Sequence, residues 1–232
     1  MLRQHATAPR AGQRRQRGFS IMELMIGITV GMIVVSGALM LFVRNLNGSR
    51  LLLNETRLNQ DLRAAVDLVT RDLRRAGYWG NAIQGTVALG ATSATTQNPY
   101  SAVSTASSSE VAYQFSRDAT EDNALGVAEQ FGFRLSAGAI QMNSGNGWMD
   151  ITDARTITIT NFQISPSVTS LPLGYLCPKT CSVGTPNCPT VTVRSFNVLV
   201  QGQSVSDSNV LRDLRTTVRV RNDQLAGTCP VA

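Results

Sequence analysis

Two residues near the N-terminus, Gly18 and Glu23, are candidate functional residues because of their types and positions. Gly18 is a small residue at the junction between an arginine-rich leader and a long apolar run, and Glu23 is an acid at the start of that run. A carboxylate in a membrane helix costs about 2.5 to 3.5 kcal/mol at the helix centre and less toward the interface. Glu23 is therefore either a functional residue that needs a partner, or a side chain that reaches the headgroups at the positive end of its helix.

Residues for acid–base or nucleophilic catalysis are scarce in this sequence. The single histidine, His5, lies in the leader, which leaves the rest of the chain without a Ser/His/Asp or Cys/His set. Phosphate-binding and dinucleotide-binding glycine motifs do not occur. Asp150 and Asp153 are typical of a solvated turn rather than of a catalytic pair. We therefore predict that the chain is not an enzyme and needs no cofactor.

The four cysteines all follow the apolar run, at Cys177, Cys181, Cys188 and Cys229. In an exported domain they predict disulfides, and four cysteines allow three pairings between which the sequence does not choose. Cys177 with Cys181 would close a small ring and leave Cys188 to tie down Cys229. Zinc is the alternative, but the spacing C-x3-C-x6-C lacks the usual CxxC pair and no histidine is near. We predict no metal site.

An apolar helix has to position Gly18 and Glu23. Residues 24–43 form a run of 20 residues without a charge, which as a helix spans the ~30 Å hydrocarbon layer of a bilayer. The leader carries five arginines and no acid, so the N-terminus stays in the cytoplasm and the remainder is exported. A secretory signal is disfavoured because the run is too long and no A-x-A-like site follows it. A plain single-pass anchor fits the length and the flanking charge equally well.

Three glycines in this run, Gly27, Gly31 and Gly37, are candidates for close packing between helices. Gly27 and Gly31 form a GxxxG pattern, and small residues at this spacing let helices approach closely. The alternative explanation is that glycine is common in transmembrane helices generally.

Beyond the membrane run, residues 44–76 continue as an amphipathic helix. Apolar residues recur there at spacings of three and four, at Leu58, Leu62, Ala65, Val66, Val69, Leu73 and Ala76. No proline interrupts residues 19–76. These residues therefore predict one helix about 87 Å long, weakest at residues 45–49 and ended by Gly77.

The remaining residues, 77–232, predict a β-rich globular domain with a cysteine-containing C-terminal region. Alternating, β-branched and aromatic residues predict strands at 111–115, 131–135, 156–160, 195–200 and 217–221. Glycine and asparagine predict a turn at 143–147, and the Ser/Thr/Ala-rich residues 90–109 predict an exposed loop. We expect Tyr78 and Trp79 to pack the helix end onto this domain, the alternative being contact with a neighbour. The predicted fold class is α+β, a long helix packed against a β-rich domain.

Residues 18–25, GFSIMELM, with the basic leader before them and the apolar helix after them, closely resemble the N-terminus of type IV prepilins and of the related secretion pseudopilins. The resemblance implies a leader peptide of residues 1–18, which a membrane prepilin peptidase removes by cutting between Gly18 and Phe19. It also implies methylation of the new Phe19 amino group and a pilin-like fold.

The same resemblance assigns residues 19–43 to a transmembrane and assembly helix. It implies that Glu23 pairs with the Phe19 amino group of a neighbouring subunit, so that each charge offsets the burial of the other and sets the register of the two helices.

Residues 72–81, DLRRAGYWGN, are similar to the end of the long helix in PilW-type minor pilins, and more loosely to the J-type pseudopilin of type II secretion. Residues 217–222 resemble the closing strand of that minor-pilin family. The resemblance implies a Gram-negative inner-membrane protein that later enters a surface pilus. Its implied partners are the major pilin and other minor pilins, in a tip complex that primes fibre growth and supports a large adhesin.

Net charge bears on the remaining alternatives. The precursor has 21 basic and 15 acidic residues, a formal net charge of +6, and loss of the five leader arginines leaves +1. A DNA-binding pilin for uptake is disfavoured on this ground, because affinity for DNA depends on neutralising phosphates. A J-type pseudopilin shares the N-terminal chemistry and stays open, as does a membrane-anchored domain with an uncut N-terminus.

Overall fold

The computed structural model describes residues 18–86, 97–185 and 188–230. The chain divides into two units, residues 1–50 and residues 51–232. Of the predicted leader, only Gly18 falls among the described residues.

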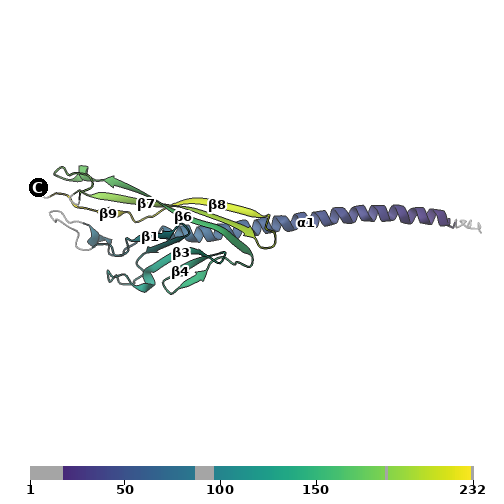
Figure 1. Ribbon diagram of the computed structural model, residues 1–232, viewed down its shortest axis with the longest axis horizontal. Helices are drawn as coiled ribbons and strands as arrows, with labels where there is room; N and C mark the ends of the chain where they lie inside the picture. Colours follow the sequence, from purple (N-terminus) through teal and green to yellow (C-terminus); the bar gives the residue numbers. More distant parts are fainter. Residues whose placement is uncertain (1–17, 87–96, 186–187, 231–232) are drawn as a thin grey trace, which may run out of the picture. The chain divides into compact units, whose positions relative to one another are not determined.

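One helix, α1 (Ile21–Leu73), runs from the first unit into the second (Figure 1). Its 53 residues correspond to about 80 Å at 1.5 Å per residue, and the weak point predicted at residues 45–49 is helical. The predicted stripe is buried on the domain half of α1 and in the turn after it, at Leu58, Leu62, Ala65, Val66, Val69, Leu73 and Ala76. The period of 3.6 residues placed these side chains on one face.

The first sheet is an antiparallel meander in the order β1-β2-β3-β4-β5. Its strands are β1 (Val103–Ser107), β2 (Glu110–Gln114), β3 (Gln130–Ser136), β4 (Ala139–Ser144) and β5 (Trp148–Asp150). The turn predicted at residues 143–147 connects β4 to β5, with positive φ at Gly145 and Gly147. The prediction of a loop at 90–109 is wrong where β1 forms; residues 87–96 lie outside the described residues.

The second sheet contains β6 (Ile157–Pro172), β7 (Thr190–Ser204), β8 (Leu211–Arg219) and β9 (Gln224–Ala226). β7 is central: β6 pairs along one side of it, and β8 and then β9 pair with successive parts of it. Three short 3-10 helices complete the described elements, η1 (Ala82–Gly85), η2 (Val127–Glu129) and η3 (Gly174–Leu176). The five predicted strands correspond to β2, β3, β6, β7 and β8.

Both sheets and the domain half of α1 contribute to one hydrophobic core. From the first sheet come the aromatic residues Tyr113, Phe131 and Phe133, with Phe115 just after β2. The rings of Phe115 and Phe131 stack with centroids 3.9 Å apart. From the second sheet come Phe162, Ile164, Phe196, Val198 and Val200. The α+β fold class, with a long helix packed against a β-rich domain, is confirmed.

Candidate processing and assembly site

The N-terminal segment leaves Gly18 and Phe19 outside the helix. The backbone N–H of Leu24 donates to the carbonyl of Ser20 at 3.0 Å, and α1 begins at Ile21. Phe19 is 83% exposed, and no neighbouring atom lies within 4 Å of where a Cβ on Gly18 would be. The bond between them is therefore in non-helical backbone without side-chain cover from the described residues.

Glu23 lies in the first turn of α1 and is exposed. Its position suits the positive end of the helix dipole. Among the ion pairs of the described residues none involves Glu23. A positive partner for this carboxylate in an apolar medium would have to come from the chain's own N-terminus or from another molecule.

The other polar side chains in this part of α1 are satisfied within the helix. Thr29 Oγ1 donates to the carbonyls of Met25 and Ile26 at 3.1 and 2.9 Å. Ser36 Oγ donates to the carbonyl of Met32 at 2.7 Å. Hydroxyls bonded in this way cost little in hydrocarbon, so Glu23 is the exception in this segment.

The apolar half of α1 is long and apolar enough to cross a membrane, by length and composition, and none of that apolar window is buried. At Gly27, Gly31 and Gly37 an added Cβ would meet no atom within 4 Å. Among the residues that the structure describes, nothing requires glycine at these positions. Their role in packing against other helices remains a prediction.

The end of α1 is tied to the β-rich domain at the predicted stop. Gly77 has φ +73° and donates its N–H to the Gln114 carbonyl at 2.7 Å. Asn222 Nδ2 donates to the Ala76 carbonyl at 3.1 Å, and Asn98 Nδ2 to the Gly77 carbonyl at 2.9 Å. Asn98 and Asn222 cap carbonyls that the helix leaves unpaired. Sequence reasoning missed both asparagines, because they lie far from the helix in the chain.

Trp79 and Tyr78 behave differently. Trp79 is 5% exposed, and its Nε1–H donates to Asn123 Oδ1 at 2.9 Å. Tyr78 is 50% exposed. The predicted packing role is confirmed for Trp79 and is wrong for the Tyr78 ring, which a helix end can leave in solvent.

The disulfides join Cys177 to Cys229 and Cys181 to Cys188. The pairing favoured from the sequence, Cys177 with Cys181 and Cys188 with Cys229, is wrong. The reason is the pairing of β9 with the start of β7, which returns the chain end to the tip of the β6–β7 hairpin beside Cys177. This contact is long-range, so spacing along the chain gave no sign of it.

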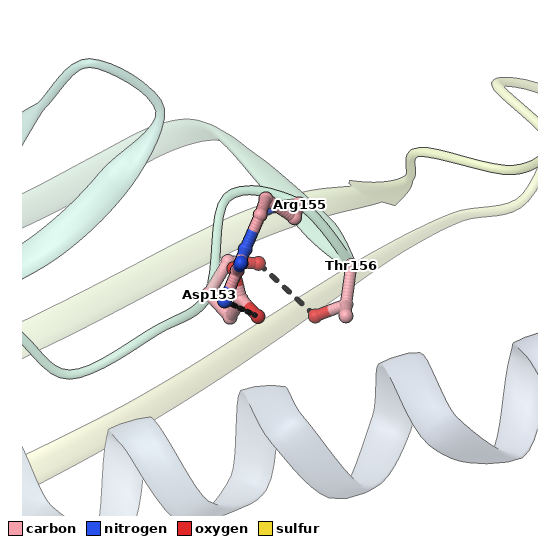
Figure 2. Close-up of polar contacts among 3 residues, drawn as sticks. All are labelled: Asp153, Arg155 and Thr156. Carbon is pink, nitrogen blue, oxygen red and sulfur yellow. Dashed lines mark hydrogen bonds and ion pairs between the residues drawn. The ribbon is translucent and has the colours of Figure 1, made fainter.

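The acids singled out from the sequence occupy a turn and a strand. Figure 2 shows Asp153 with Arg155 and Thr156: Arg155 Nε donates to the Asp153 carboxylate at 3.1 Å, and Thr156 Oγ1 donates to the Asp153 carbonyl at 3.0 Å. The hydrogen bonds from Arg155 lower the pKa of the Asp153 carboxyl. Asp150 accepts from Gln141 Nε2 at 2.8 Å. The two acids thus have separate structural partners.

A cavity of about 220 Å³ lies beside this turn. Its polar lining comes from Asn54, Arg57, Arg155, Thr156, Ser204 and Ser206. The lining contains no carboxylate, imidazole or thiol. General acid–base or thiol catalysis therefore has no residue set there.

A second group of polar residues surrounds Glu121. The sequence patterns did not predict this group. The hydroxyl of the buried Tyr100 donates to Glu121 Oε1 at 2.8 Å, and the Gly80 N–H donates to Oε2 at 3.0 Å. Carboxylate oxygens of Asp118, Glu121 and Asp122 lie within 4.8 Å of one another. Glu121 thus accepts hydrogen bonds from donors of this chain. Because Gly80 lies just after the end of α1, these bonds help to hold the helix end in place.

Comparison with known families defines the class first. Residues 13–39 match the family described as the Prokaryotic N-terminal methylation motif. With the apolar helix and the β-rich domain, this match defines a pilin-like protein whose N-terminal helix suits an inner-membrane anchor before assembly.

Residues 51–220 match the family described as Prepilin peptidase-dependent protein B. This match covers most of the chain, which therefore belongs to that family. Dependence on prepilin peptidase supports processing by that enzyme and a role as a minor pilin or pseudopilin. No curated protein and no solved structure matches the chain.

Proposed function

We propose that this chain is a minor pilin of a type IV pilus, of the PilW type, which helps to prime fibre assembly within a tip complex. The observation that carries the proposal is the combination of the two family matches, one over the N-terminal methylation motif and one over residues 51–220. The methylation motif and the matched domain together suit a protein that is processed, anchored in the inner membrane and then assembled.

In this proposal the prepilin peptidase cuts between Gly18 and Phe19 and the new amino group is methylated. The exposed, non-helical backbone around this bond supports access for the enzyme. Glu23 then pairs with the Phe19 amino group of a neighbouring subunit, either the major pilin or another minor pilin. The pair brings together two charges that would each be costly alone in hydrocarbon.

The bonds at the end of α1 support the next step. The hydrogen bonds at Ala76 and Gly77 and the buried stripe of α1 fasten the domain half of α1 to the β-rich domain. In the fibre, this domain contacts other minor pilins and a large adhesin.

Deleting the gene and counting surface fibres tests this function. We expect fewer fibres, restored by the wild-type chain, with type II secretion unchanged. Normal fibres together with lost type II secretion would instead identify a J-type pseudopilin and overturn the proposal.

A further inference from the structure

One end of the domain holds β9 and the start of β7 (Figure 1). Its surface departs from the usual pattern of a sheet face. Over the core, β7 points Phe196, Val198 and Val200 inward, and the residues between them lie on the outer face. That outer face carries Asn197, Leu199 and Gln201, opposite Thr217, Arg215 and Asp213 of β8. All but Leu199 of these side chains are polar or charged, as expected for a sheet face in water.

Toward the end of the domain the same outer face becomes apolar. Val191 of β7 lies directly between Leu171 of β6 and Leu225 of β9, and residues opposite one another in an antiparallel sheet share a face. Leu171 is 48% exposed and Leu225 is 45% exposed. The last eight residues of β6 are all exposed, so this part of the hairpin extends beyond the core.

The hairpin loop adds three more exposed apolar side chains, Tyr175, Leu176 and Val183, which are 79, 64 and 68% exposed. Both disulfides hold this loop, and the Cβ position of Gly174 lies 2.9 Å from the sulfurs of Cys181 and Cys188. A surface held in this way loses little conformational entropy on binding. We call Leu171, Val191, Leu225, Tyr175, Leu176 and Val183 together the distal apolar surface.

Charge near this surface is one-sided. No acid occurs in residues 154–206, and Lys179 is the only charged residue between Arg155 and Arg194. The nearest acid beside β9, Asp223, is paired with Arg219 at 2.8 Å. The centres of protein interfaces are depleted of charge and enriched in tyrosine and other large side chains.

We propose that the distal apolar surface is the docking site for a different protein chain, which presents an apolar surface with a carboxylate positioned for Lys179. The acid beside β9 on this chain, Asp223, is already paired with Arg219, so a carboxylate that is free to meet Lys179 is better supplied by a different chain. The inference rests on the proposed function and deepens it, because it names the surface through which the β-rich domain contacts another chain.

On the β6 side of this surface, the contact is made by side chains rather than by an added strand. The Ile164 N–H points away from β7, since it donates to the Ser108 carbonyl. Every second residue of β6 from there shares this direction, including Pro166 and Pro172, which have no N–H to donate. Prolines on an edge strand block strand addition, which leaves the apolar face as the surface for recognition.

The test places a photo-crosslinking p-benzoylphenylalanine at Tyr175 of the full-length chain in its own cells. Met149 on β5, which is 53% exposed, is the matched control position. We expect position 175, and not position 149, to give an adduct with one other chain identified by mass spectrometry. An adduct between two copies of this chain, or equal adducts at both positions, would overturn the proposal.

Binding of the identified chain to the full-length protein in detergent then tests the chemistry. We expect Lys179→Glu to weaken it by about 3- to 10-fold and Leu176→Asp by at least about 10-fold, with Met149→Asp unchanged. A mass shift on reduction checks that both disulfides remain. Unchanged binding in both variants, or no adduct at position 175, would show that the surface is not a docking site, while processing at Phe19 would be unaffected.

Discussion

Glu23 is the acid in the first turn of an otherwise uncharged helical segment, exposed and without an ion-pair partner among the described residues. The hydroxyls of Thr29 and Ser36 are satisfied within the helix, so the cost of placing this segment in hydrocarbon falls mainly on one carboxylate. A neighbouring subunit with a free amino group would offset that cost. In the proposed function, this residue therefore links membrane insertion to assembly.

Replacing Glu23 by Ala should separate the two processes. Membrane insertion should stay the same or improve, because a buried charge is removed, while incorporation into fibres should fall by about 10-fold or more because the subunit pair is lost. Immunoblots of membranes and of sheared fibres measure both. Glu55→Ala is the matched control, since Glu55 lies further along α1 and pairs with Arg212 at 3.0 Å. Equal incorporation of both variants would show that Glu23 is dispensable for register.

Glu121 makes the stability of the domain depend on pH. Burial acts to raise its pKa, but hydrogen bonds from Ser116, Tyr100 and the N–H groups of Asn123 and Gly80 lower it overall. A group with a lowered pKa in the folded state stabilises the fold above its ordinary pKa of about 4.3. That stabilisation is lost as the pH falls through the folded-state pKa.

Tyr100 gives the opposite dependence on pH. Burial and the hydrogen bond to Glu121 raise the pKa of the Tyr100 hydroxyl. Its contribution to the stability of the fold is therefore present below about pH 10 and is lost above it.

We therefore expect Glu121→Gln to be less stable than the wild type at pH 7, and the difference to narrow as the pH falls below about 4. Chemical unfolding of the full-length protein in detergent at pH 3 to 7 measures this. A difference that stays constant across that range would show that the ionised carboxylate contributes nothing to folding.

At the scale of elements, the end of α1 depends on one backbone conformation. Gly77 has φ +73°, and a Cβ there would lie 2.9 Å from Nη2 of Arg194, which is itself buried. Gly77→Ala should cost about 1–2 kcal/mol for the left-handed backbone and more for the displaced arginine. Gly184 is the matched control, with φ +88° and no atom within 4 Å of the Cβ position. If alanine at position 77 and alanine at position 184 lower the unfolding free energy equally, the Arg194 side chain can move aside without an energetic cost.

The two disulfides should contribute unequally to stability. Cys177–Cys229 has a sequence separation of 52 and Cys181–Cys188 one of 7. The loop-closure estimate is ~4 kcal/mol for the long loop and ~2.5 kcal/mol for the short one. Replacing Cys177 and Cys229 by Ser should therefore lower the unfolding free energy more than replacing Cys181 and Cys188. The reverse order would mean that the short ring holds the hairpin tip in place and the long link does not.

Local patterns predicted the elements well where one periodicity dominates. The apolar stripe of α1 and the alternating residues of β2 and β3 have clear patterns, and the structure confirms these elements. β1 was missed because its Ser/Thr-rich residues lack an apolar face. The full length of β6 was missed because Pro166 and Pro172 argue against a strand, although prolines fit an edge strand when their nitrogen faces away from its partner.

At the scale of the whole molecule, the two units have different surfaces. Large apolar residues of the N-terminal part of α1, from Ile21 to Leu46, are exposed all around the helix, whereas residues from Leu58 onward line a packed core. A helix that is apolar on every side needs lipid or other helices around it.

The candidate site could be predicted from the sequence because the residues of its motif are contiguous. The disulfide pairing could not, because it depends on strands that only the fold brings together.

The central claim is that this chain is processed at Gly18 and then assembled, and the intact mass of the protein in sheared fibres tests it most directly. We predict a chain that begins at Phe19 with one added methyl group. A Gly18→Arg variant should stay unprocessed and absent from fibres, since no neighbouring atom lies within 4 Å of that position and the fold does not depend on it. Mature protein that retains residues 1–18, or a processed chain that never enters fibres, would contradict the account.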